Sequence, residues 1–160
     1  MRETETKEFY FEDDGRIPNN PNLPLLLCPS VLDELDPLKC QNLLADNGWS
    51  GAWVNGVFSY HHYHSTAHEV LCVTGGSARI AFGGASGDVV VIPAGVGHCN
   101  LGSSGDFTVI GAYPEGQSWD LLTGEPDERP EALEDIRNVP LPETNPLFGN
   151  SGPLLRSWAG

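Results

Sequence analysis

Five histidines gather in one part of this 160-residue sequence, and their types and spacing indicate a chemistry. All five lie within residues 56–101, and most of them fall in the short stretch 61–68. Glu69 follows directly and stands beside Val70 and Leu71 in an otherwise apolar segment. Burying an unpaired carboxylate is costly, and a cation held together with nearby imidazoles offsets that cost. The stretch therefore predicts a metal site.

The order of residues also indicates which side chains face one another. Side chains alternate along a strand, so His62 and His64 should share one face while Tyr63 points the other way. A tight turn would then return the chain and direct Glu69 inward. His98 comes later, after a turn rich in proline and glycine that fixes its direction. Three neutral imidazoles and one carboxylate suit Fe(II), Mn, Co, Ni, Cu or Zn.

Two alternatives stay open at this point. A His-x-His pair alone is a weak signal, because histidines on a strand often satisfy each other. Strand alternation turns His61 and His68 away from His62, His64 and Glu69. His68 lies in the expected turn, however, where alternation does not fix its direction, so it could replace Glu69 as a ligand.

The elements that must position these residues are predicted to be mostly strands. Residues 51–113 alternate short β-forming runs with glycine-rich turns, which is typical of a sandwich or barrel. We expect strands at 69–74, 78–82, 88–92 and 107–113, preceded by β-forming residues between 53 and 60. Two short helices are expected, one between Pro37 and Gly48 and one from Pro130 to about residue 138.

The flanks are predicted to be irregular parts of one domain that spans residues 1–160. Residues 1–30 form an extended arm, because four prolines prevent a regular helix. We expect this arm to mediate a homodimer through Phe9, Tyr10 and Phe11. Residues 114–160 form a loop-rich tail that should pack on the outer sheet. The alternative is that Trp119 and Asp120 fold over the mouth of the barrel as a lid.

Charge and composition exclude several classes of partner. The formal net charge is −14, with 22 acidic residues against eight Lys and Arg, and no basic stripe offsets it, so nucleic acid is not expected to bind. The apolar runs are too short for a membrane span, and the N-terminus lacks the apolar core of a secretion signal. A cytoplasmic protein with four reduced cysteines is the expectation.

Two segments of the chain match the motifs of a known family. The first cupin motif is matched without a gap by Gly56, His62, His64, Glu69 and Gly76. The second is matched by Gly87, Pro93, Gly95 and His98. The chain also resembles one subgroup, the small single-domain YjlB-like cupins, over stretches spread along nearly its whole length, namely 14–20, 47–49, 55–56, 61–71, 111–114, 124–130 and 152–155.

This resemblance implies an all-β fold, the double-stranded β-helix or jelly-roll barrel of the cupins, with one or two short peripheral helices. It also implies that His62, His64, Glu69 and His98 hold a metal ion inside the barrel. Two departures stand out: Gly102 occupies a position that is usually Asn, and the connection between Gly76 and Gly87 is short. The short connection predicts that one strand is missing and that one edge of the barrel is open.

The resemblance further implies metal-dependent chemistry on a small organic molecule. Four protein ligands leave up to two positions of an octahedral ion open, enough for a bidentate substrate or for a substrate atom and dioxygen. We expect a dioxygenase-type oxidoreductase that uses Fe(II) or Mn(II), with Tyr60 or His68 as the proton donor. The expected lining of its pocket is apolar and consists of Val54, Phe58, Tyr60, Leu71 and Val73.

Two other functions are compatible with the same resemblance. One is a non-catalytic barrel that binds or senses a small molecule through its metal, which the short connection between the motifs favours. The other is a cupin isomerase, which needs a cationic group to hold substrate oxygens. Arg79 is the sole cationic candidate within the barrel region for that role.

Overall fold

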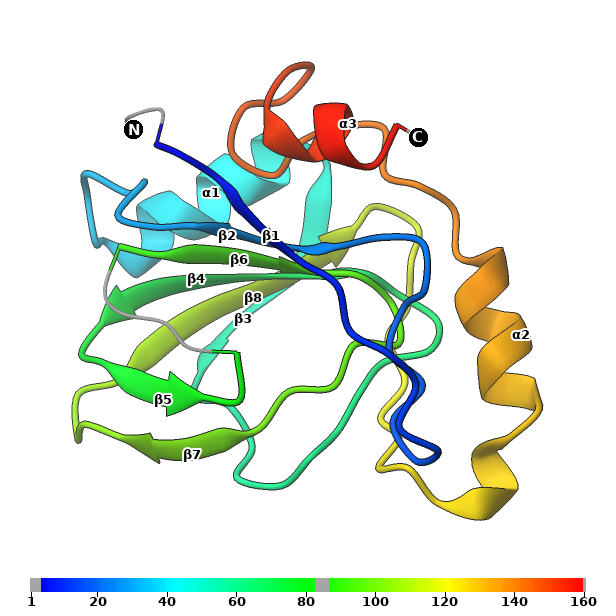
Figure 1. The fold of residues 1–160 in the computed structure, drawn as a ribbon. Coiled ribbons are helices and arrows are strands. Elements are labelled where there is room, and N and C mark those ends of the chain that lie inside the picture. The colour runs from blue at the N-terminus through cyan, green and yellow to red at the C-terminus, as the bar shows by residue number, and fades with distance from the viewer. Residues whose placement is uncertain (1–3, 83–86, 160) are drawn as a thin grey trace.

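The protein is built mainly of antiparallel strands, with a few short helices at its periphery (Figure 1). The computed structural model describes residues 4–82 and 87–159. The strands among them are β1 (Lys7–Phe9), β2 (Leu25–Cys28), β3 (Trp49–Asn55), β4 (Glu69–Gly75), β5 (Ala78–Ile80), β6 (Val89–Ile92), β7 (Asn100–Ser103) and β8 (Thr108–Pro114). The helices are α1 (Pro37–Asp46), α2 (Glu131–Asn138) and α3 (Pro153–Ser157), with a 3-10 turn η1 (Pro126–Glu128).

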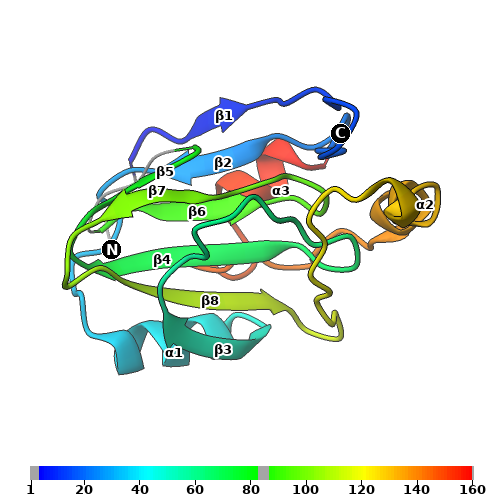
Figure 2. The same ribbon diagram turned by 90° about the horizontal axis from the view of Figure 1, so that it is seen from below.

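The described strands form two sheets. Six of them pair in the order β1-β2-β6-β4-β8-β3, and β5 pairs with β7 in a small second sheet. Helices α1 and α3 lie on one side of the large sheet, and the β5–β7 pair lies on the other (Figures 1 and 2). The all-β class is therefore confirmed, whereas the strand pairing leaves the two sheets separate and does not by itself close a barrel.

Strand β4 shows how alternation builds the two layers. Val70 and Cys72 face the helices and join the core cluster that contains Leu44 of α1 and Trp158 after α3. Leu71 and its neighbours of the same parity face the second sheet and join a separate apolar cluster. Because both faces are covered, β4 is buried along nearly its whole length. Glu69 shares the parity of Leu71, so it points toward the second sheet.

Helix α1 begins and ends where the sequence predicts. The Asp36 carboxylate accepts hydrogen bonds from the backbone N–H groups of Leu38 and Lys39, and Pro37 occupies the first turn. The helix ends before Gly48, whose φ of +78° lies in the left-handed region that glycine adopts without strain. This helix packs against the large sheet through Cys40 and Leu44.

The N-terminal arm differs from the expectation. Residues 25–28 form β2, an inner strand of the large sheet between β1 and β6, because this four-residue run is almost wholly apolar. Strand β1 pairs with β2 of its own chain, and Phe11 is half-buried against the apolar cluster around Leu71. Of the three aromatic residues expected to mediate a dimer, only Phe9 and Tyr10 are exposed, and the homodimer stays a prediction.

Other expectations have mixed outcomes. The β-forming run from residue 53 to 60 is a strand only as far as Asn55, and the following residues form a loop that leads to the histidines. The connection at 83–86, where a missing strand was expected, lies outside the described residues.

All four cysteines are buried and free of disulfides. Among the described residues, no helix combines the length and apolar character that a membrane crossing requires.

Candidate metal centre

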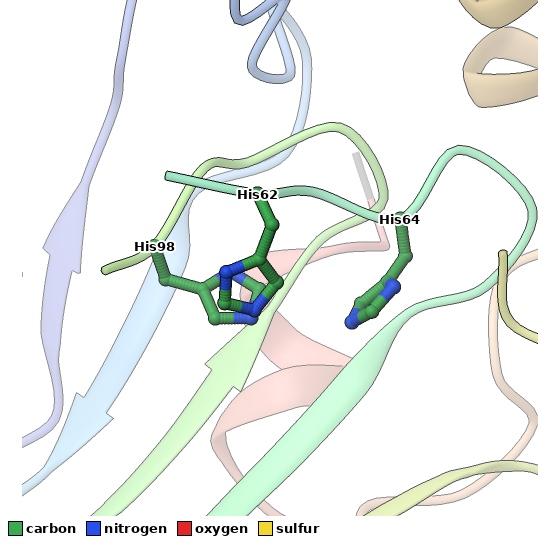
Figure 3. Close-up of side chains that lie close together, drawn as sticks. All are labelled: His62, His64 and His98. Carbon is green, nitrogen blue, oxygen red and sulfur yellow. The ribbon is translucent and has the colours of Figure 1, made fainter. Parts of the chain in front are cut away.

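Three histidines from two loop segments meet between the sheets. His62 and His64 lie on the segment before β4, and His98 lies on the segment before β7; all three side chains project into the same space (Figure 3). The two segments are joined by a β-bridge, in which His62 N–H donates to the His98 carbonyl at 3.2 Å and His98 N–H donates back at 2.9 Å. This exchange fixes the spacing of the two backbones that carry the rings.

The turn before His98 is held by close backbone contacts. Gly95 has a φ of +93°, and a Cβ atom there would lie 2.4 Å from the Asn19 carbonyl oxygen, so no larger residue fits. The Gly95 N–H donates to the His64 carbonyl at 2.7 Å, and the Gly97 N–H donates to the side chain of Asn19 at 3.1 Å. The rigid turn expected from the sequence is therefore pinned to both the arm and the histidine segment.

Backbone carbonyls orient each imidazole. The Nδ1 atom of His62 lies 2.9 Å from the carbonyl oxygen of Tyr60, and that of His98 lies 3.2 Å from the carbonyl of Val96. The Nδ1 atom of His64 hydrogen-bonds to the carbonyl of Asp120. A carbonyl only accepts, so each Nδ1 carries a proton and each Nε2 is left to face the shared space. This is the arrangement that metal-ligating histidines adopt.

These three side chains are buried, and a ring nitrogen of each lies within 4.8 Å of the others, so they could hold a metal ion. Glu69 is not part of this three-histidine group, but its carboxylate lies beside two of the rings. One oxygen of its carboxylate lies 3.0 Å from Nε2 of His64, and the other lies 3.7 Å from Nε2 of His98. The donors present are thus imidazole nitrogens and carboxylate oxygens, which fit a divalent transition metal.

Burial and pairing set the charge state of the site. Burial lowers the pKa of His98 to about 3 and also lowers the pKa of His62, so both rings are neutral at pH 7. Burial is the largest single influence on His64 and disfavours its charged form, but the hydrogen bond and charge of Glu69, together with the Asp120 carbonyl and charge, outweigh it and raise the pKa of His64. Burial raises the pKa of Glu69, yet the hydrogen bond from His64 and its charge bring that pKa below the ordinary value. Without a metal, His64 and Glu69 therefore favour each other's charged forms, and a divalent cation would take the place of that pairing.

A cavity of about 330 Å³ opens onto the histidines. Its walls are largely apolar and aromatic, which is usual for small-molecule sites. Val54, Phe58 and Leu71 line it as expected, whereas Tyr60 and Val73 are not among its described lining residues. The expected cationic candidate, Arg79, is exposed on β5 and does not line the cavity either.

His68 does not join the other histidines. Its Nδ1 accepts a hydrogen bond from the Ala94 N–H at 2.9 Å, and its ring packs on Trp158 on the helix-covered side of the large sheet, at a centroid distance of 4.9 Å. Its Nε2 has no hydrogen-bond partner of normal geometry, and burial lowers the pKa of His68 more than the Pro140 carbonyl raises it. The prediction that His68 replaces Glu69 or donates a proton to a substrate does not fit this position. Extending the alternation of β4 back by one residue, from Glu69 to His68, predicts that His68 faces the helix-covered side.

Tyr60 lies near the site but at its outer edge. Its ring is exposed and stacks on Phe58 at a centroid distance of 5.0 Å. Its carbonyl, rather than its hydroxyl, contacts a site histidine, His62. His61 is exposed, as strand alternation predicts, and therefore serves as a matched control for the buried histidines.

Three further residues contact the site that the motifs do not identify. The hydroxyl of Tyr113 hydrogen-bonds to Glu69 and accepts a hydrogen bond from Nε1 of Trp53 at 2.8 Å. Asp120 supplies the carbonyl at His64, and Trp119 lines the cavity. The tail around Trp119 thus packs at the site, and the expectation that it covers the outer sheet is wrong for this segment. The alternative expectation, in which Trp119 and Asp120 fold over the mouth, comes nearer to this position.

Fold and site together define a β-rich protein with a buried three-histidine cluster able to bind a metal ion. The chain is 48% identical over 164 residues to "Uncharacterized protein YjlB" of Bacillus subtilis (strain 168), and the match covers 98% of each chain. The chain therefore belongs to the YjlB family. No family model and no solved structure matches it.

Proposed function

We propose that this protein is a metal-dependent cupin oxidoreductase that acts on a small organic molecule with dioxygen. In this proposal His62, His64, Glu69 and His98 hold one Fe(II) or Mn(II) ion. When bound, the ion would supply a Lewis acid and a one-electron redox centre at the base of the cavity. The fold would be a cupin double-stranded β-helix in which the small β5–β7 sheet forms part of the second layer.

The observation that carries the proposal is the orientation of the three buried imidazoles. Backbone carbonyls hold their Nδ1 atoms, which leaves the three Nε2 atoms free for a metal ion, and the Glu69 carboxylate lies 3.0 Å from Nε2 of His64. A purely structural cluster would need no such convergence, because each ring could be satisfied by a neighbour. The four residues are also those that match the two cupin motifs.

The walls of the cavity favour chemistry that excludes water. Trp53, Phe58 and Leu71 surround the histidines with apolar surface, which strengthens electrostatic interactions inside the site. Tyr113 would keep the Glu69 carboxylate in place through its hydroxyl. Arg79 is exposed and does not line the cavity, so the described lining residues include no cationic group of the kind that an isomerase needs.

Two linked measurements test the proposal. The protein is purified without chelator for elemental analysis, and metal-free protein is then loaded anaerobically with Fe(II). Oxygen uptake is measured with small enols and diketones. We expect one metal ion per chain and substrate-dependent uptake, both lost in His98→Gln and both kept in His61→Ala. Metal binding with no uptake on any such compound would contradict the enzyme and support a metal-dependent binding protein. Absence of stoichiometric metal would contradict the site itself.

A further inference from the structure

Residues 117–122, which we call the strap, run alongside the histidine segment and are bonded to it almost residue by residue. Tyr63 and Leu122 exchange backbone hydrogen bonds of 2.9 and 3.0 Å. The Asp120 carboxylate accepts from the N–H of Ser65 at 2.7 Å and also from the Ser65 hydroxyl. The remaining links are from Thr66 Oγ1 to the Ser118 carbonyl at 2.7 Å and from His68 N–H to the Gln117 side chain at 3.0 Å. The strap is therefore fixed relative to the site.

This anchoring places one large aromatic side chain at the cavity. Trp119 sits between the two anchored residues Ser118 and Asp120, and its ring lines the cavity although 49% of the residue remains exposed. Its centroid lies 5.6 Å from the His64 ring, and it stacks on Tyr113 at 6.1 Å with an interplanar angle of 21°. The two rings form one continuous aromatic wall directly beside the histidines.

The charge of the lining restricts what this wall can meet. The described lining residues include Glu69 but no lysine or arginine. With neutral imidazoles, a divalent ion and this carboxylate leave one formal positive charge, which a single ionised oxygen of a ligand would neutralise. A second negative charge on the ligand would have no partner among apolar walls, which is costly.

We propose that Trp119, stacked on Tyr113, is a specificity-determining residue that contacts the flat, apolar part of a monoanionic ligand bound through oxygen at the metal centre. This inference rests on the proposed metal site and names the class of ligand that the site takes. Contact with an indole face favours planar, π-bearing groups over saturated or small ones. A ligand with a carboxylate far from the metal is excluded, because the described lining residues include no cation to pair with it.

Two hydroxamic acids with the same oxygen head test the inference. Acetohydroxamic acid and benzohydroxamic acid both bind a divalent metal through two oxygens as monoanions, and only the second carries a ring. Each is titrated into Co(II)-loaded protein and followed by the visible absorption of Co(II). We expect benzohydroxamate to bind about tenfold more tightly in the wild type. Trp119→Ala should remove that preference while Co(II) affinity and acetohydroxamate affinity stay within about twofold.

Control variants separate this role from a general effect on the strap. Leu121→Ala changes another exposed apolar residue of the strap that does not line the cavity, and it should keep the full preference. Trp119→Phe should keep part of it. An equal effect of Trp119→Ala on both hydroxamates, or no effect on either, would overturn the inference and leave the metal site standing. Failure of the wild type to bind Co(II) would overturn both.

Discussion

The packing of Gly111 under Trp53 gives a quantitative prediction for Gly111→Ala. The two residues are paired across β3 and β8, and a Cβ atom on Gly111 would lie 2.2 Å from Cζ2 of the Trp53 indole. The indole must retreat by roughly 1.3 Å or more to reach an ordinary carbon–carbon contact. That movement breaks its 2.8 Å hydrogen bond to the Tyr113 hydroxyl. Overpacking costs about 1–3 kcal/mol and the hydrogen bond about 1 kcal/mol, so we expect a loss of roughly 2–4 kcal/mol.

Urea unfolding of metal-free protein measures this loss, and a double-mutant cycle identifies its cause. Gly105→Ala is the matched control, because a Cβ atom there meets nothing within 4 Å, and it should be nearly neutral. In a Trp53→Ala background the cost of Gly111→Ala should largely disappear, because the clashing ring is gone. An equal cost in both backgrounds would show that the Trp53 indole is not what requires glycine at position 111.

Three further predictions concern the strap, the buried His68 and the metal. Asp120→Ala removes the hydrogen bonds to Ser65 and should weaken Co(II) binding, measured by titration, about 10–100-fold. Asp127→Ala changes an exposed residue and should leave Co(II) affinity unchanged. Equal affinities in the two variants would show that the strap does not support the site. Burial lowers the pKa of His68 from 6.5 to about 4, so stability present above pH 6.5 is lost as pH falls toward 4. His68→Asn keeps an acceptor for the Ala94 N–H but does not titrate. Between pH 7 and pH 4.5 the free energy of unfolding of the metal-free wild type, measured in urea, should fall by roughly 2–3 kcal/mol more than that of this variant. Equal losses in the two proteins would contradict this. Co(II) at one hundred times its Kd should stabilise the wild type and His61→Ala alike by about 2.7 kcal/mol in urea unfolding and should leave His98→Gln unchanged; stabilisation of His98→Gln would show that the ion binds elsewhere.

Much of the strand pattern could be predicted because period-two alternation is a local property. Strand β4 begins at Glu69 as expected, and alternation correctly separates His62 and His64, which join the histidine cluster, from Tyr63, which packs in an apolar cluster with Ile136 of α2. Strand β2 was not predicted, since four apolar residues among prolines read equally well as part of an extended arm. It becomes a strand because it completes the pairing of β6, which is a tertiary effect.

The supports of the site could not be read from the motifs. The carbonyls that orient the imidazoles belong to the backbone of Tyr60, Val96 and Asp120. Every residue has a backbone carbonyl whatever its side chain, so residue type does not reveal this role. The contacts of Trp119 and Tyr113 join positions far from the histidines in sequence, which depend on how the strap returns across the site. Residue type and spacing identify donors, whereas the fold decides which neighbours hold them.

Anomalous diffraction from crystals soaked in Mn(II) would show whether the four side chains bind one metal ion. We predict a single strong anomalous peak in contact with Nε2 of His62, His64 and His98 and with the carboxylate of Glu69. A peak bound elsewhere on the chain, or no peak at these residues at saturating Mn(II), would contradict the proposed metal site.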